Sequence, residues 1–230
     1  MADDPWMIEH AVDLVIFDCD GVLIDSEVIS TRMTIEMLAA LGYDVSEPDA
    51  NSRFVGRSYR SMRSDVEADW GQKLPASFET DLEQATVNAM AKALQPVRGV
   101  SAMLSALKRP RCVASSSSVD WIKQGLTLTG LIHHLDPYLF SASMVENGKP
   151  APDLFLHAAA EMGSTPEHSL VIEDSVPGVE AGVAAGMTVI GFTGGSHAGH
   201  PAHAERLRDV GAKHVIPDIS ILQSLLQDDH

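Results

Sequence analysis

The sequence predicts a three-layer α/β fold, in which helices cover both faces of a parallel sheet, with an all-helical domain inserted into it. Short apolar runs recur along the chain, and helical patterns separate most of them. Runs of this length without polar alternation suit strands covered on both faces, and strand-helix alternation favours right-handed βαβ units. The expected strands are 12–17, 112–114, 170–172, 188–192 and 214–216, with a weaker pattern at 138–141.

Proline and glycine mark the expected helices of the second half. Pro177 begins an alanine-rich helix that Gly186 ends, and Pro152 begins one that Gly163 ends. Proline lacks a backbone N–H, which does no harm in the first turn of a helix because the N–H groups there have no partner within the helix. Glycine readily adopts the left-handed conformation that often ends a helix. These boundaries support the alternation of strands and helices.

Residues 26–95 break this alternation, because they contain helical patterns and no convincing strand. One apolar pattern runs from Ile29 to Leu41 and stops at Gly42. An insert of about 70 residues is far longer than a single crossover needs. It begins just after the first strand, so it leaves the sheet at the edge where ligands bind in open α/β folds. We therefore predict a catalytic core of residues 1–25 and 97–230 and a helical cap, or lid, of residues 26–96.

The composition excludes several classes of protein. The chain has 16 Lys and Arg against 32 Asp and Glu, a formal charge of −16, so nucleic acids and anionic lipid surfaces are repelled on average. Cys19 and Cys112 lie at or within expected buried strands and are too few for a disulfide framework. The start of the chain shows no basic segment followed by an apolar one, so no export signal is visible. We expect a cytoplasmic monomer or weak dimer that binds neither nucleic acid nor membranes.

The strongest chemical signal follows the first expected strand and reads Asp-Cys-Asp-Gly, from Asp18 to Gly21. Two carboxylates two positions apart at a strand end can point into one cleft, and glycine permits a sharp turn. Such a pair suits phosphoryl transfer, because one ionised carboxylate can attack phosphorus while a protonated one donates to the leaving oxygen. An isolated Asp-x-Asp is also typical of a solvated turn, so the pair alone leaves both interpretations open.

Four motifs together resemble the haloacid dehalogenase superfamily of phosphatases, in the branch that carries a helical C1 cap after the first motif. The first motif is the run from Asp18 to Glu27. Ser115 follows the strand 112–114, Lys149 opens a Lys-Pro-Ala-Pro-Asp segment, and Glu173-Asp174 follows the strand 170–172. The order of the motifs makes the resemblance specific, and it covers nearly the whole chain. It implies a Rossmann-like core, a helical cap and phosphatase activity.

The resemblance also implies a role for each catalytic residue. Asp18 would be the nucleophile that forms an aspartyl phosphate, and Asp20 would be the general acid and base. Lys149 would balance charge on the transferring phosphoryl group, while Ser115 and the backbone N–H of Ser116 would hold its oxygens.

A metal site is expected for a physical reason as well, since several carboxylates can share one site only if cations lie among them. Mg²⁺ prefers oxygen ligands and bridges carboxylates to phosphate. By resemblance, the ligands would be the carboxylates of Asp18 and Asp174 and the backbone carbonyl of Asp20. Glu173 would act directly or through water.

Substrate selection is expected in the cap. The candidates lie around Gly56 and include four arginines in an otherwise acidic chain: Arg53, Arg57, Tyr59, Arg60 and Arg63. Because arginine forks suit carboxylate and phosphate groups, we predict that Arg53, Gly56 and Arg57 bind the substrate. A solvated basic helix face would explain the same cluster.

The expected substrate is a small phosphorylated metabolite, either a sugar or a sugar acid. Asp20 argues against dehalogenation, because a halide leaves without a proton. A mutase of the β-phosphoglucomutase type shares the four motifs, but such mutases carry a histidine in the first cap helix where this chain has Ser30. The run from Asp25 to Arg32 looks closer to bacterial sugar-acid phosphatases of the 6-phosphogluconate phosphatase type. A protein that binds a phosphorylated metabolite without turnover is a third alternative.

Three histidines, His197, His200 and His203, follow the strand 188–192 in a glycine-rich segment. We interpret them as loop residues rather than as a second metal site.

Overall fold

The computed structural model describes residues 11–54, 59–198 and 201–226. The chain divides into two compact units, one made of Met1–Asp25 and Gln95–His230 and the other of Ser26–Leu94. We call them the core unit and the helical unit. Within the described ranges, no helix is both long enough and apolar enough to cross a membrane.

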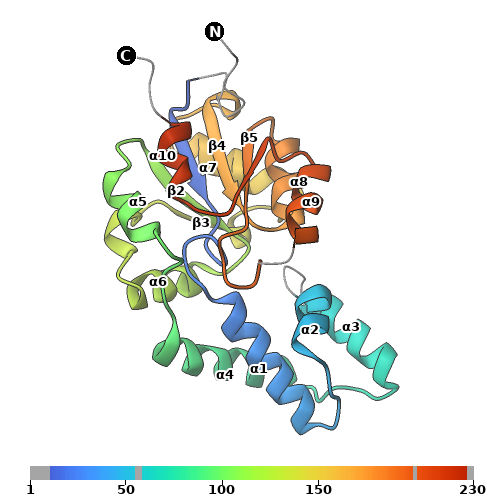
Figure 1. The fold of residues 1–230 in the computed structure, drawn as a ribbon. Coiled ribbons are helices and arrows are strands. Elements are labelled where there is room, and N and C mark those ends of the chain that lie inside the picture. The colour runs from blue at the N-terminus through green and yellow to red at the C-terminus, as the bar shows by residue number, and fades with distance from the viewer. Residues whose placement is uncertain (1–10, 55–58, 199–200, 227–230) are drawn as a thin grey trace. The chain divides into compact units, whose positions relative to one another are not determined.

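The core unit contains a parallel sheet of six strands in the order β3-β2-β1-β4-β5-β6 (Figure 1). This sheet confirms the predicted fold class, and the weak pattern at 138–141 is a strand in the structure. Its six strands are β1 (Leu14–Phe17), β2 (Arg111–Ser115), β3 (Leu139–Ser141), β4 (Ser169–Glu173), β5 (Thr188–Phe192) and β6 (His214–Ile216).

The direction of the chain reverses beside β1. From β1 the chain moves outward to β2 and β3, then returns to the other side of β1 as β4 and continues to β5 and β6. In the registered pairs, Phe17 of β1 lies beside Val113 of β2 and Ile172 of β4. Residues that directly follow β1 and β4 therefore emerge together at the carboxyl edge, at the reversal where open α/β sheets bind ligands.

Helices cover both faces of the sheet, as right-handed crossovers in opposite directions require (Figure 1). One side chain cluster joins the strands to α7, α8 and α9 and includes Leu14, Ile16, Phe155 and Val179, all with at most 1% of their surface exposed. Pro177 lies in the first turn of α8, and Gly163 and Gly186, with φ of 69° and 75°, follow α7 and α8 as predicted. The helices of this unit are α5 (Val100–Ala106), α6 (Val119–Leu128), α7 (Asp153–Glu161), α8 (Val176–Ala184), α9 (Pro201–Asp209) and α10 (Ile221–Leu225), with short 3₁₀ turns at Ile132–His134, Ala142–Met144 and Pro166–His168.

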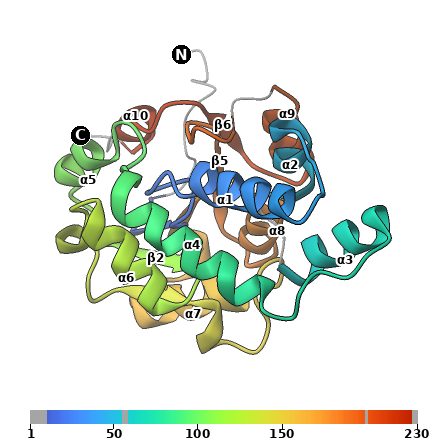
Figure 2. The same ribbon diagram turned by 90° about the horizontal axis from the view of Figure 1, so that it is seen from below.

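The helical unit consists, in its described residues, of α1 (Glu27–Ala40), α2 (Glu47–Phe54), α3 (Tyr59–Trp70) and α4 (Phe78–Ala93). The all-helical character predicted for this stretch is confirmed. Helices α1 and α4 lie side by side (Figure 2). The unit has an apolar cluster of its own, which includes Leu38, Phe54, Val66 and Phe78. A separate cluster of this kind is what allows an insert to form a compact unit.

Candidate active site

Lys149 lies at the centre of the candidate site, in the loop before α7. Its Nζ lies 2.6 Å from Oδ1 of Asp18 and 2.6 Å from Oε1 of Glu173. The same ammonium group donates to the backbone carbonyl of Ala114 at 3.0 Å and lies 4.9 Å from the centre of the Phe155 ring. Lys149 therefore joins the carboxyl ends of three neighbouring strands, β1, β2 and β4.

The loop that carries Lys149 is held by Asp153, the first residue of α7. Oδ2 of Asp153 accepts hydrogen bonds from the side chain of Asn147 at 3.0 Å and from its backbone N–H at 3.3 Å. The loop is thereby fixed to the start of a helix that packs on the sheet. This explains how the Lys-Pro-Ala-Pro-Asp segment brings a long, flexible side chain to one point.

Asp18 and Lys149 are both buried, and each changes the pKa of the other. Burial raises the pKa of the Asp18 carboxyl well above its ordinary value; Lys149 opposes this shift, and the neighbouring carboxylates of Glu173 and Asp174 add to it. Burial alone would lower the pKa of Lys149, but Asp18 and Glu173 raise it above the ordinary lysine value. The amine therefore stays protonated, and a single ammonium group faces more than one carboxylate.

An acidic cluster forms where β1 and β4 end. Asp18, Glu173 and Asp174 each offer one carboxylate oxygen, and these three oxygens lie within 4.8 Å of one another. Glu173 is fully buried, and its Oε2 accepts hydrogen bonds from the backbone N–H and the hydroxyl of Ser175 at 2.8 and 2.9 Å. A buried set of oxygen donors with excess negative charge fits a small, hard divalent cation such as Mg²⁺.

Asp20 directs its carboxylate toward α6 rather than into this cluster. Its Oδ2 accepts a hydrogen bond from the hydroxyl of Ser117 at 2.7 Å, and its Oδ1 accepts one from the indole N–H of Trp121 at 3.0 Å. Asp20 is partly exposed, whereas Asp18 has 7% of its surface exposed. The two aspartates of the first motif therefore lie in different surroundings, as two different chemical roles require.

Gly21 makes the close approach of the first turn to Asp174 possible. Its φ is 79°, a conformation that side chains disfavour, and its N–H donates to the carbonyl of Ile24 at 2.8 Å. A Cβ at this position would overlap the carboxylate of Asp174. The glycine thus allows the first motif and the fourth to pack against each other.

Ser115 is the last residue of β2, the strand beside β1, and Ser116 follows it. Ser115 is buried, and its Oγ accepts the backbone N–H of Ser117 at 3.1 Å. Ser116 is exposed, and the loop continues into α6, whose N-cap Ser118 accepts the N–H of Trp121. Backbone N–H groups at the start of a helix favour anions.

Arg53, one of the arginines predicted to select substrate, lies on α2 of the helical unit. Nη1 of Arg53 donates to the hydroxyl of Tyr43 at 2.9 Å and lies 3.3 Å from Oδ2 of Asp69, which also accepts the Tyr43 hydroxyl at 2.6 Å. Arg53 thus contributes to a polar network within this unit. Gly56 and Arg57 lie outside the described residues, as does His200.

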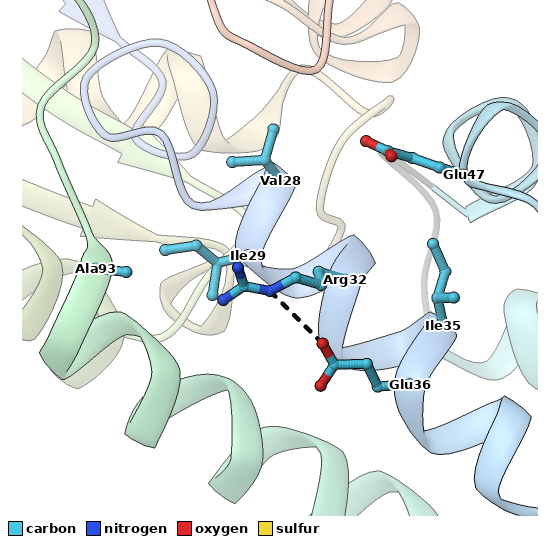
Figure 3. A pocket seen from close by; sticks show the side chains of 7 residues that line it. All are labelled: Val28, Ile29, Arg32, Ile35, Glu36, Glu47 and Ala93. Carbon is cyan, nitrogen blue, oxygen red and sulfur yellow. Dashed lines mark ion pairs between the residues drawn. The ribbon is translucent and has the colours of Figure 1, made fainter.

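The helical unit also contains a pocket of about 590 Å³ (Figure 3). Arg32 and Glu36 of α1 contribute charged side chains to its wall, with Nε and Oε1 3.8 Å apart. Arg32 is an arginine of this unit that lines a pocket, and the sequence reasoning did not single it out. The remaining lining residues are Val28, Ile29 and Ile35 of α1, Glu47 at the start of α2 and Ala93 at the end of α4.

Among the side chains that contact the predicted site residues, Ser117, Trp121, His197 and His203 were given no catalytic or binding role in the sequence analysis. Ser117 and Trp121 bond to Asp20, as described above. His197 Nε2 lies 2.9 Å from Oδ2 of Asp174, and His203 Nε2 lies 2.7 Å from the backbone carbonyl oxygen of the same residue. Single residues of this kind leave no periodic signal, so the structure was needed to find them.

The chain is similar to known proteins in both sequence and fold. The family model of the haloacid dehalogenase-like hydrolases matches residues 12–186. The chain is 30% identical over 187 residues to 6-phosphogluconate phosphatase of Escherichia coli (strain K12), an alignment that covers 81% of this chain and 85% of that protein. A haloacid dehalogenase-like protein of unknown function from Agrobacterium tumefaciens str. C58 superposes with a TM-score of 0.88 at 39% identity, covering 94% of this chain and 98% of the other. A hydrolase of the same family from Deinococcus radiodurans R1, solved with bound phosphate and sodium, superposes with a TM-score of 0.81 at 31% identity, covering 94% and 95%.

Proposed function

The chain belongs to the haloacid dehalogenase-like hydrolases, and we propose that it is a Mg²⁺-dependent phosphatase that acts through an aspartyl phosphate on a small phosphorylated sugar or sugar acid. The observation that carries this proposal is the position of Lys149, whose ammonium group lies 2.6 Å from both Asp18 and Glu173 beside the acidic cluster. This arrangement combines a buried carboxylate nucleophile, a fixed positive charge and a set of oxygen donors. Phosphoryl transfer depends on positioning and on charge stabilisation, which these groups supply.

In the first step, a carboxylate oxygen of Asp18 attacks phosphorus while the bond from phosphorus to the substrate oxygen breaks. Asp20, as a carboxylic acid, gives its proton to the departing oxygen. Lys149 stabilises the negative charge on the transferring group, and Ser115 with the N–H of Ser116 holds its oxygens. When bound by Asp18, Asp174, Glu173 and the backbone carbonyl of Asp20, Mg²⁺ would add further positive charge beside that group.

In the second step, water opens the aspartyl phosphate. Asp20, now ionised, accepts a proton from the water as its oxygen bonds to phosphorus, and the bond from phosphorus to Asp18 breaks. The chain returns to its starting state, and inorganic phosphate is released. Ser117 and Trp121 donate to the two carboxylate oxygens of Asp20 and hold the group in one orientation for both steps.

The substrate class rests on two supports. The relative from E. coli acts, by its name, on the phosphate ester of a sugar acid. Arg53 and Arg57 near Gly56 were predicted from the sequence to bind such an acid, and Arg32 in the pocket of the helical unit is a further cation of that kind. We therefore propose 6-phosphogluconate and related sugar phosphates as the first compounds to test.

The test is phosphate release over a panel of sugar phosphates and sugar-acid phosphates, with and without Mg²⁺. We expect release that requires Mg²⁺, that stops on chelation, and that Asp18→Asn abolishes. Asp209→Asn, an exposed aspartate on α9, serves as the matched control and should keep full activity. Full activity in Asp18→Asn would falsify the assignment of the nucleophile.

The mutase alternative predicts a different outcome when the chain is given glucose phosphates. A mutase would interconvert glucose phosphates, with a bisphosphate primer and no net release of phosphate. The residue at the position of the mutase histidine is Ser30, which favours hydrolysis. Phosphorus NMR of the reaction with glucose phosphates separates the outcomes, since only hydrolysis accumulates inorganic phosphate.

A further inference from the structure

Two histidines from the segment after β5 hold Asp174 at two points. His197 Nε2 lies 2.9 Å from Oδ2 of the Asp174 carboxylate, and only 3% of the His197 side chain is exposed. His203 Nε2 lies 2.7 Å from the backbone carbonyl oxygen of Asp174. A carbonyl oxygen can only accept, so the Nε2–H of His203 donates to it.

The tautomer of His203 is fixed by its other neighbour. Nη2 of Arg206 lies 3.2 Å from Nδ1 of His203. A guanidinium group can only donate, so Nδ1 accepts and the proton of the neutral ring sits on Nε2, facing Asp174. Arg206, one turn further along α9, thereby orients the ring that holds the backbone of Asp174.

The segment that carries His197 is itself fixed to the residues that follow β1. The backbone N–H of Ser196 donates to Oδ1 of Asp25 at 3.0 Å, and the Ser196 hydroxyl donates to Oδ2 of the same residue. A Cβ at Gly195 would overlap the carbonyl oxygen of Gly21, so the two backbones touch there. His197 is therefore held in place by the contacts of its neighbours Gly195 and Ser196 and by the burial of its own side chain.

We propose that His197 and His203 are positioning residues that fix Asp174 in the orientation needed to bind the divalent cation. The inference rests on the proposed function, which makes Asp174 a metal ligand. A hydrogen bond to one carboxylate oxygen stops rotation of the group and directs the other oxygen, while the bond to the carbonyl fixes the backbone. Partners of this kind behind a ligating carboxylate commonly change metal affinity about 10- to 100-fold when they are removed.

The experiment measures Mg²⁺ binding by titration calorimetry on the full chain, so the readout does not depend on turnover. We expect His197→Ala to weaken Mg²⁺ binding about 10-fold or more, and His203→Ala to weaken it less, because its bond is to the backbone. His197→Gln places an N–H donor near the position of Nε2 and should restore part of the affinity. Activity of His197→Ala should recover as Mg²⁺ is raised toward saturation.

His168→Ala is the matched control. His168 also pairs with an aspartate, with Nδ1 3.2 Å from Oδ2 of Asp13, but it lies at the amino end of β4, whereas Asp174 follows the carboxyl end. Its removal should leave the Mg²⁺ affinity unchanged. Thermal melting of each variant without metal shows whether the chain still folds. If His197→Ala does not fold, His197→Gln serves as the test variant in its place.

Three results would overturn the assignment. An unchanged affinity in folded His197→Ala would show that the histidine only packs, and a higher affinity would show that it competes with the cation. Absence of Mg²⁺ binding in the unaltered chain would remove the metal site itself, and with it this part of the proposed function. The first two results leave the metal site of the proposed function intact, so the failures can be told apart.

Discussion

The charged side chains at the candidate active site of the core unit and those of the Arg53 network in the helical unit differ in how much water reaches them. Lys149 and Glu173 have 4% and 1% of their side chains exposed, whereas Arg53 and Asp69 in the helical unit have 31% and 59%. Both sets contain ion pairs of good geometry. The difference in burial decides what each set is worth to stability and what it can do in catalysis.

Burial makes the pairs of the core unit costly to form, because two charges lose their water. Such groups often stabilise a fold no better than apolar residues of similar size would, so their presence at a sheet edge favours a chemical role. Exposed pairs, in contrast, cost little and contribute little, since solvent screens them. We therefore expect substitutions in the two units to separate into large effects on chemistry and small effects on folding.

The largest effect is expected for Lys149→Met. It removes the ammonium group from Asp18 and Glu173, so phosphate release should fall about 10³-fold or more. Unfolding should become easier by about 3 kcal/mol, because two buried carboxylates lose their partner. Burial already raises the pKa of Asp18, and a carboxyl with a raised pKa in the folded state favours folding at low pH. The loss of stability should therefore shrink as the pH falls.

Urea unfolding at neutral and at acidic pH checks this prediction, with Lys123→Met on the exposed face of α6 as the control. A loss of stability that stays constant over this pH range would mean that the carboxylates do not carry unbalanced charge. Retained phosphate release would remove Lys149 from the mechanism.

A smaller effect is expected for Glu173→Gln. The carboxylate uses one oxygen for Lys149 and the other for Ser175, so an amide must turn an NH₂ group toward one of two donors. We expect phosphate release to fall about 10²-fold, because Lys149 loses a buried partner beside the nucleophile. Glu180→Gln, an exposed residue on α8, should have no effect. Equal rates for the two variants would show that Glu173 has no part in the site.

Trp121→Phe should disturb the position of the Asp20 carboxyl, and the effect should be largest where the leaving group needs a proton. It removes the indole N–H from Asp20 but keeps an aromatic ring on α6. Substrates with poor leaving groups, such as alkyl phosphates, need protonation most, so their rates should fall about 10-fold while aryl phosphates change little. Trp70→Phe, which alters a tryptophan packed on Tyr43 in the helical unit, is the control. Equal losses for alkyl and aryl phosphates would show that Trp121 does not assist protonation of the leaving group.

The fold could be predicted, and the four motifs could be located, because each has a local signal. Strands such as β1 and β4 are short apolar runs, and in a parallel sheet their carboxyl ends meet at one edge, so Asp18 and Glu173 had to lie close together. The prediction of a haloacid dehalogenase-type phosphatase is confirmed by the family match and the phosphatase relative. The weak pattern at 138–141 reflects the length of β3, three residues, which is too short for a clear period.

The contacts around the motif residues could not be predicted, because they depend on how distant segments pack. Trp121 is a single aromatic residue on α6, and His197 lies in a loop, so neither stands out by spacing. Their roles depend on the exact place at which a helix or loop returns to the sheet edge. The interpretation as loop residues is correct for His197 but wrong for His203, which lies on α9, and the contacts of both with Asp174 were not foreseen.

The smallest effect is expected for Arg53→Met in the helical unit. It removes the donor to Tyr43 and Asp69, and because solvent reaches the Arg53–Asp69 pair, whose side chains are 31% and 59% exposed, the melting temperature should fall by about 2 °C or less. Arg60→Met, on an exposed residue of α3, should leave it unchanged. Substrate binding by Arg53 stays a prediction that the same variant tests, since loss of a carboxylate partner would raise KM for sugar-acid phosphates and not for neutral sugar phosphates. If KM stays constant for both classes, Arg53 serves only the network with Tyr43 and Asp69, and the search for a specificity residue moves to Arg32 in its pocket.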